Sequence, residues 1–262
     1  MLRTIENPTT VLPKLILLLS LAIPFSLAGQ EEVDGKVDWG AEAEAGISVF
    51  FGASDQTTAN TALGLVRKSQ NWESDNGFSY LYGEATDLEG NTSVIKRSWG
   101  AVSNLNYRGF NRVNPYAFGS AESSLQKKID LRLKGGTGAK LTARDTETTR
   151  LDFAVAVLAE QTFKDTEENG EGELLARWTG AFNLRRSFAE ERTIFEAKAD
   201  YNPVFDEFDN YTIDAETSLA FRLTEVIRLK LSVVDKYDSR AEERGARDNN
   251  DGQVLFSVLA AF

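Results

Sequence analysis

The chain has 262 residues, of which 42% are apolar and 10% aromatic, enough material for one folded domain with its own core. It contains neither Cys nor His, which excludes disulfides, thiolate or imidazole metal sites, and catalysis by an imidazole base. The formal net charge of −11 argues against a nucleic-acid partner. We therefore expect one domain without enzymatic activity and without a cofactor.

An N-terminal apolar segment predicts export of the protein. Lys14 precedes an apolar run from Leu15 to Phe25, and the small residues Ser26 and Ala28 stand where a signal peptidase reads the chain. We predict a cleaved signal peptide over residues 1–28 and one mature domain over residues 29–262. The alternative is a single membrane anchor, but that would need roughly 20 consecutive apolar residues, and this run is much shorter.

Beyond this segment, apolar and polar residues alternate with a period of two, which is typical of β-strands. Phe195, Ala197 and Ala199, for example, alternate with Glu196 and Lys198. The pattern predicts an all-β fold, an antiparallel transmembrane β-barrel of about 12 strands. Residues 29–262 would form this outer-membrane β-barrel domain, with both termini on the periplasmic side. We expect strands near residues 37, 57, 75, 92, 114, 130, 148, 173, 192, 209, 226 and 252.

The connections between these strands alternate in length. Short turns are expected near residues 108–114, 143–147, 187–191 and 224–226, and longer, mostly acidic loops over residues 84–92, 164–173, 202–209 and 236–252. Short periplasmic turns and long outer loops produce this spacing in bacterial barrels. The alternation is weakest in two strands, where Arg97 and Ser120 fall on the face expected to be apolar.

The alternating charges distinguish a membrane barrel from a soluble one. A soluble barrel hides its apolar residues inside, whereas a membrane barrel turns them toward lipid and lines its lumen with polar groups. A soluble core filled with charge would need a partner for every buried charge. A soluble periplasmic lipid-binding barrel is the alternative. The membrane arrangement predicts these lumen residues: Arg132, Lys134, Arg177, Glu196, Lys198, Asp214, Glu216, Arg228 and Lys230.

The final strand ends on an aromatic residue, with Phe256, Val258 and Phe262 on its apolar face. It looks like the C-terminal signal of bacterial outer-membrane barrels, so we expect the barrel assembly machinery to be a partner. Aromatic residues near strand ends also predict girdles at both membrane interfaces. The predicted girdle residues are Trp39, Phe51, Tyr80, Tyr82, Trp99, Tyr107, Tyr116, Tyr201, Tyr211 and Tyr237.

Short motifs follow one another in a fixed order along the chain: Trp39-Gly40, Tyr80-Leu81-Tyr82, Tyr116-Ala117-Phe118, Gly136-Thr137-Gly138 and Tyr237-Asp238-Ser239. In this order they resemble the salt-induced outer-membrane protein family, domain of unknown function 481, over nearly all of the mature chain. Residues 52–57 depart from the Ser-Gly-Asn-Thr turn typical of that family. The resemblance implies an outer-membrane barrel without an assigned activity, and it supplies no catalytic residues.

Several functions are compatible with these features. The first is a narrow channel for ions or small solutes, or an envelope-maintenance barrel, linked to osmotic or salt stress, with mixed lumen charges that tune selectivity. The second is a salt-bridged, non-transporting barrel whose acidic loops contact lipopolysaccharide, outer-membrane lipid or another protein. The loop carboxylates lack the spacing of a calcium loop, so we interpret them as a solvated surface. Asp200, Asp214 and Glu216 could act as acid and base, but pairing with lumen cations explains them better.

Overall fold

The computed structural model describes residues 37–50, 55–87, 91–110, 112–163 and 172–261. The predicted signal peptide over residues 1–28, and the predicted roles of Phe51 and Phe262, lie outside the described residues. All statements below concern the barrel formed by residues 37–261.

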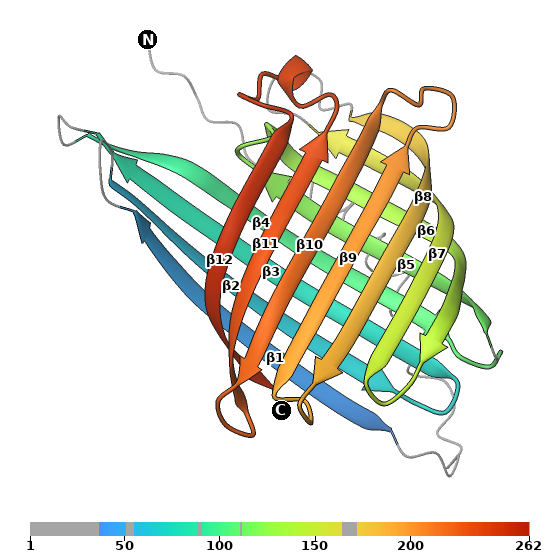
Figure 1. The fold of residues 1–262 in the computed structure, drawn as a ribbon. Coiled ribbons are helices and arrows are strands. Elements are labelled where there is room, and N and C mark those ends of the chain that lie inside the picture. The colour runs from blue at the N-terminus through green and yellow to red at the C-terminus, as the bar shows by residue number, and fades with distance from the viewer. Residues whose placement is uncertain (1–36, 51–54, 88–90, 111, 164–171, 262) are drawn as a thin grey trace. The chain divides into compact units, whose positions relative to one another are not determined.

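The described chain forms twelve strands and one short 3₁₀ helix (Figure 1). The strands are β1 (Asp38–Phe50), β2 (Asp55–Lys68), β3 (Trp72–Thr86), β4 (Thr92–Tyr107), β5 (Val113–Ser124), β6 (Ile129–Asp145), β7 (Thr149–Phe163), β8 (Glu173–Phe188), β9 (Thr193–Pro203), β10 (Tyr211–Arg222), β11 (Ile227–Asp238) and β12 (Asn250–Ala261), and the helix is η3 (Glu242–Arg244). In the part of the chain that the structure describes, no helix is long and apolar enough to cross a membrane.

Each strand pairs antiparallel with its neighbours in sequence, and β12 pairs with β1 to close the barrel. The closing register runs from Glu42 opposite Ala261 to Gly46 opposite Ser257. Over these five residues of each strand, closure removes the free sheet edge that hydrocarbon would leave without hydrogen-bond partners. The predicted fold class, an all-β antiparallel barrel of about 12 strands, is confirmed.

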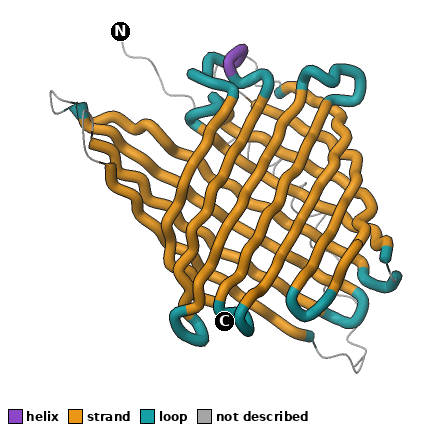
Figure 2. The backbone as a smooth tube through the Cα atoms, in the orientation of Figure 1, coloured by secondary structure: helices purple, strands orange, loops and turns teal. Residues whose placement is uncertain are grey.

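The connections divide the barrel into two ends (Figure 2). We call the end with residues 69–71, 108–112, 146–148, 189–192 and 223–226 the short-turn end. The opposite end, with residues 204–210 and 239–249 among its connections, is the long-loop end. Residues 125–128 form a short turn at the long-loop end, so the predicted alternation of lengths is not strict there. The last strand ends, and the first strand begins, at the short-turn end.

Side-chain exposure shows that the apolar set faces outward and the charged set inward. Phe256 is 62% exposed and Val155 is 65% exposed, whereas the charged Arg132 and Glu160 are 2% and 1% exposed. This polarity is the reverse of a soluble lipid-binding barrel and is that of a barrel surrounded by hydrocarbon. Phe256 and Val258 of the predicted assembly signal both lie on the outward face.

Aromatic residues gather near both ends of the wall. At the long-loop end, the rings of Tyr201, Tyr211 and Tyr237 lie side by side on β9, β10 and β11, with centroids 5.6 and 5.4 Å apart. At the short-turn end, Trp72 and Tyr107 meet edge to face at 5.0 Å. These contacts occur where amphipathic rings of membrane barrels meet the two interfaces.

Tyr116 departs from the predicted girdle. It shares the inward face of β5 with Glu122, whose carboxylate pairs with the lumen residue Arg132, so Tyr116 also points into the lumen. Ser120 lies on this same inward face, and the outward positions in the middle of β5 are the small residues Ala117, Gly119 and Ala121. The sequence predicts that the face of β5 with Tyr116 and Ser120 contacts lipid. In the structure this face lines the lumen.

The outward face of β7 supports a stability prediction. Replacing Val155 with Arg, near the middle of β7, should lower the free energy of unfolding in lipid vesicles by about 2–4 kcal/mol, because a charge at the bilayer midplane must be desolvated. Gln161→Arg, on the same face near the long-loop end, is the control and should cost about 1 kcal/mol or less. Urea titration followed by Trp fluorescence measures both, and equal costs would contradict the assigned membrane position.

Candidate functional site

The lumen carries the charged residues that the sequence predicts, and it is the candidate functional site. All nine predicted lumen residues lie on inward-facing positions of β6, β8, β9, β10 and β11. Seven of them take part in ion pairs within 4.0 Å: Arg132, Lys134, Arg177, Glu196, Lys198, Glu216 and Lys230. Asp214 and Arg228 make no such pair within the described ranges.

Arg132 is the centre of the largest ion-pair cluster. Its Nη2 donates to Asp238 Oδ2 at 2.9 Å, and its Nε donates to Thr162 Oγ1 at 3.0 Å. Glu160 and Glu122 lie 3.7 and 3.4 Å from the same guanidinium. Arg132 is on β6 and Asp238 is on β11, and β7 to β10 lie between these strands in the wall. The contact therefore crosses the lumen instead of joining neighbouring strands.

Arg177 extends this cluster toward the loop that joins β9 and β10. Its Nη2 donates to Glu160 Oε1 at 3.0 Å, and its Nη1 donates to the carbonyls of Asn202 and Asn210 at 3.0 and 3.1 Å. Arg177 is 2% exposed. A buried cation held by a carboxylate and two carbonyls is compensated for its loss of hydration, so this arm of the cluster is rigid.

The loop over residues 239–249 folds onto the same cluster. Arg244 of η3 donates to Asp238 Oδ2, and its Nε donates to the carbonyl of Lys127 at 3.4 Å. Ala241, a residue of this loop, is fully buried. Gly245 ends the helix with φ of +84°, a left-handed conformation that favours glycine. The loop is thus a cover over the long-loop end of the lumen.

Arg240 connects this cover to the neighbouring loop. Its guanidinium pairs with Glu207, with Asp209 at 3.3 Å and with Glu243 at 2.6 Å. These partners are exposed, in contrast to the Arg132 cluster below them. Opposite, burial lowers the pKa of Lys127 in the turn over residues 125–128, and the carboxylates of Asp214 and Glu122 counteract that shift.

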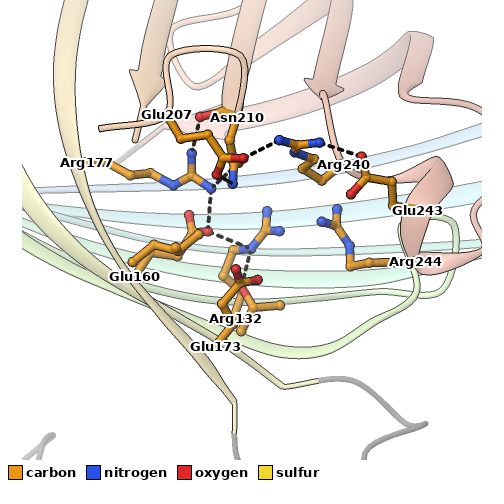
Figure 3. Close-up of a pocket in the computed structure, with 11 residues that line it drawn as sticks. Arg132, Glu160, Glu173, Arg177, Glu207, Asn210, Arg240, Glu243 and Arg244 are labelled. Atoms are coloured by element: carbon orange, nitrogen blue, oxygen red, sulfur yellow. Dashed lines mark hydrogen bonds and ion pairs between the residues drawn. The ribbon is translucent and has the colours of Figure 1, made fainter. Parts of the chain in front are cut away.

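A polar cavity of about 340 Å³ lies between the cover and the Arg132 cluster (Figure 3). Figure 3 shows guanidinium groups from β6, from β8 and from the 239–249 loop directed toward one region of this cavity. Its charged lining is balanced, consisting of Arg132, Arg177, Arg240 and Arg244 together with Glu160, Glu173, Glu207 and Glu243. Such a lining holds water or a polar ligand rather than an apolar one.

A second group of ion pairs lies in the lumen near the barrel seam. Lys230 Nζ is 3.0 Å from Glu44 Oε2 and 3.4 Å from Glu216 Oε1, and Lys198 is 2.9 Å from Glu216. Ser257 of β12 donates to Glu44 Oε1 at 2.7 Å. These contacts join β9, β10 and β11 to β1 and β12, so they brace the closing seam from the inside.

Two of the sequence motifs meet inside the barrel. The register places Tyr116 opposite Gly138 and Phe118 opposite Gly136. The rings of Tyr116 and Phe118 stack with centroids 5.8 Å apart. A Cβ on Gly136 would lie 2.7 Å from the Phe118 ring, so the glycines provide the space that these rings occupy.

Sequence reasoning missed several residues of the Arg132 cluster, namely Glu122, Glu160, Asp238 and Arg244. Glu122 and Glu160 stand on the polar positions of their strands, so alternation could have identified them as lumen residues. No local signal marks Arg244, because it reaches the lumen only through the fold of its loop. Within the described ranges, no group of carboxylates is arranged to hold a metal ion.

The closed twelve-strand sheet, the apolar outer face and the charged lumen define a transmembrane β-barrel. A family model described as "Protein of unknown function, DUF481" matches residues 43–262. The chain belongs to this family. No curated protein matches the sequence significantly.

Three solved barrels illustrate the distant structural similarity. The NanC porin is 10% identical, with 84% of this chain and 98% of that chain covered and a TM-score of 0.48. An outer membrane channel from Pseudomonas putida F1 is 10% identical, with 87% and 96% covered and a TM-score of 0.48. The KdgM porin is 12% identical, with 86% and 99% covered and a TM-score of 0.43. Similarity at this level carries no information about function.

Proposed function

We propose that the protein is a bacterial outer-membrane β-barrel that acts as a narrow channel for ions or small solutes and is held closed at its long-loop end. The apolar wall, the short turns at one end and the longer loops at the other support the location. The observation that carries the closed state is the Arg132–Asp238 contact across the lumen, covered by Arg244. No covalent chemistry is assigned to any lumen residue.

The arrangement of cavities supports a channel rather than a solid plug. The polar cavity of about 340 Å³ lies at the long-loop end, and a second polar cavity of about 430 Å³ lies at the short-turn end. The Arg132 cluster lies in the lumen beneath the first cavity, and the ion pairs of Lys230 with Glu44 and Glu216 lie farther toward the short-turn end. Two polar cavities at opposite ends, with charged side chains between them, fit a pore that a rearrangement of ion pairs would open.

The link to osmotic or salt stress stays a hypothesis, for which the cover suggests a physical route. The Arg240 pairs with Asp209 and Glu243 are exposed, so salt should weaken them. The Arg132–Asp238 pair, with both side chains 2% exposed, is screened much less. Salt alone should therefore loosen the cover before it opens the lumen.

Single-channel conductance of the refolded mature protein in a planar bilayer tests the proposal. We expect the unmodified barrel to be mostly silent, and the double variant Asp238→Asn/Arg244→Gln to show frequent discrete openings, since it removes the charge that joins β6 to β11 and the cover. The control Arg185→Gln/Glu196→Gln removes a pair between the adjacent strands β8 and β9 and should stay silent. A double variant that folds, as judged by heat-modifiable gel mobility, yet never conducts would refute the channel.

A second function is favoured by the joined loops. Arg240 ties residues 204–210 to residues 239–249, so these loops form one ordered surface. Such a surface could bind lipopolysaccharide or another protein without any transport. Binding of lipopolysaccharide that disappears in Arg240→Ala, together with a silent Asp238→Asn/Arg244→Gln barrel, would favour this function. Contact with the barrel assembly machinery stays a prediction from the final strand.

A further inference from the structure

The cavity at the short-turn end differs in charge from the balanced cavity at the long-loop end. It has a volume of about 430 Å³ and lies among the turn that joins β4 to β5, the end of β6 and the start of β7. Five basic residues are among those that line it, and we call them the basic mouth: Arg108, Arg112, Lys140, Arg144 and Arg150.

The carboxylates nearby do not neutralise the basic mouth. Arg108 pairs with Glu73 at 3.1 Å, and Arg150 pairs with Asp152 at 2.9 Å. Asp145 is the one acidic residue among those that line the cavity. The lining thus holds five cations and one carboxylate, and two of the cations pair with a carboxylate outside the lining. Arg112, Lys140 and Arg144 make no ion pair within 4.0 Å of a carboxylate in the ranges described.

Uncharged donors complete the lining. Asn106 and Asn114 are 7% and 8% exposed, and both line the cavity. Asn114 uses its carbonyl oxygen to accept a hydrogen bond from the backbone amide of Phe110 at 3.2 Å, which leaves its NH₂ group as a donor. Asn106 makes no side-chain hydrogen bond with the described residues. Amide and guanidinium donors around one polar cavity match the oxygens of phosphate and carboxylate groups.

We propose that the basic mouth is a binding site for an oxyanion of the phosphate or carboxylate class that enters the lumen from the short-turn end. Asn106, Asn114 and Lys140 are on inward-facing positions, so the ligand reaches them through the lumen opening. The excess of cations there attracts anions from solution and concentrates them at the opening. This site does not depend on whether the opposite end opens, so the channel proposal and this one can fail separately.

Binding of inorganic diphosphate to the full mature barrel, in a detergent with an uncharged headgroup, tests the site. Isothermal titration calorimetry at constant ionic strength should detect binding to the unmodified protein. The variant Arg112→Gln/Arg144→Gln should weaken it about tenfold or more, because two unpaired guanidinium groups are lost. Both side chains are exposed and without an ion pair, so the barrel should fold normally. Lys140→Gln provides an independent second variant.

The matched control is Lys68→Gln/Arg192→Gln. It removes two exposed cations at the same end of the barrel but outside the cavity, so it changes the net charge equally. We expect the control to bind diphosphate like the unmodified protein. No binding to the unmodified protein, or equal weakening in both double variants, would overturn the proposal.

Nanodiscs distinguish the two sources of such an anion. If a lipid headgroup occupies the site, phosphatidylglycerol nanodiscs should weaken diphosphate binding by competition, and phosphatidylcholine nanodiscs should not. If the ligand is a soluble anion, binding should be equal in both lipids at matched ionic strength. Loss of binding in both kinds of nanodisc would refute a site that opens to the lumen in a membrane.

Discussion

Replacing Arg132 with Met should lower the free energy of unfolding by about 3–5 kcal/mol, the cost of leaving buried charge without its partner. Arg132 is 2% exposed, and Met fills a similar length without a charge. The change would leave Asp238 with Arg244 alone, and Glu160 with Arg177 and Lys134. Because the Arg132–Asp238 contact crosses the lumen, its loss should also loosen the 239–249 loop. Urea titration in lipid vesicles followed by Trp fluorescence measures the cost.

The control for this prediction is Arg185→Met. Arg185 pairs with Glu196 at 2.5 Å, but the two side chains are 48% and 40% exposed, so water already solvates both charges. Removing this pair should cost at most about 1 kcal/mol. If Arg132→Met and Arg185→Met cost the same, then the Arg132 cluster is not shielded from water, and the closed state assigned to the long-loop end is wrong.

The alternation of apolar and polar residues predicts most of the strands, because a period of two identifies a strand and its two faces together. It therefore placed Arg132, Lys134 and Lys230 on the lumen side without any knowledge of the fold. It could not tell which charges meet across the lumen. Arg132 and Asp238 are 106 residues apart in sequence, and their contact depends on the stagger of every strand between them.

Two further failures of sequence reasoning have the same origin. The sequence predicts Tyr116 in an aromatic girdle because aromatic rings usually favour the membrane–water interface. Its inward position is possible because Gly136 and Gly138 on the next strand make room, and that is a property of the pairing register. The sequence predicts residues 236–252 only as a long outer loop, whereas in the structure Ala241 is buried and Arg244 reaches Asp238. Composition alone does not reveal that a loop folds inward.

The close approach of β6 to β7 at Gly138 leads to the second prediction with a large expected effect. A Cβ on Gly138 would lie 2.1 Å from the backbone carbonyl oxygen of Val155 and 2.6 Å from Ala156 Cβ. Backbone cannot turn aside as a flexible side chain can, so Gly138→Ala should cost about 1–3 kcal/mol or more through displaced strands. Tyr116, which lies opposite in the register, would be displaced with them.

Gly135→Ala and Gly180→Ala are the controls for Gly138→Ala, because a Cβ at either position has no atom within 4 Å. Without a clash, alanine should stabilise a strand relative to glycine by roughly 0.5–1 kcal/mol, because it has less backbone freedom to lose on folding. Replacing glycine with alanine should thus destabilise the barrel at Gly138 and stabilise it at Gly135 and Gly180. Folding yield and urea midpoints of the three variants measure it. If Gly138→Ala leaves the free energy of unfolding unchanged, then β6 and β7 are farther apart at this position than the 2.1 Å between the added Cβ and the Val155 oxygen implies. The stacked rings inside the barrel would then not require glycine.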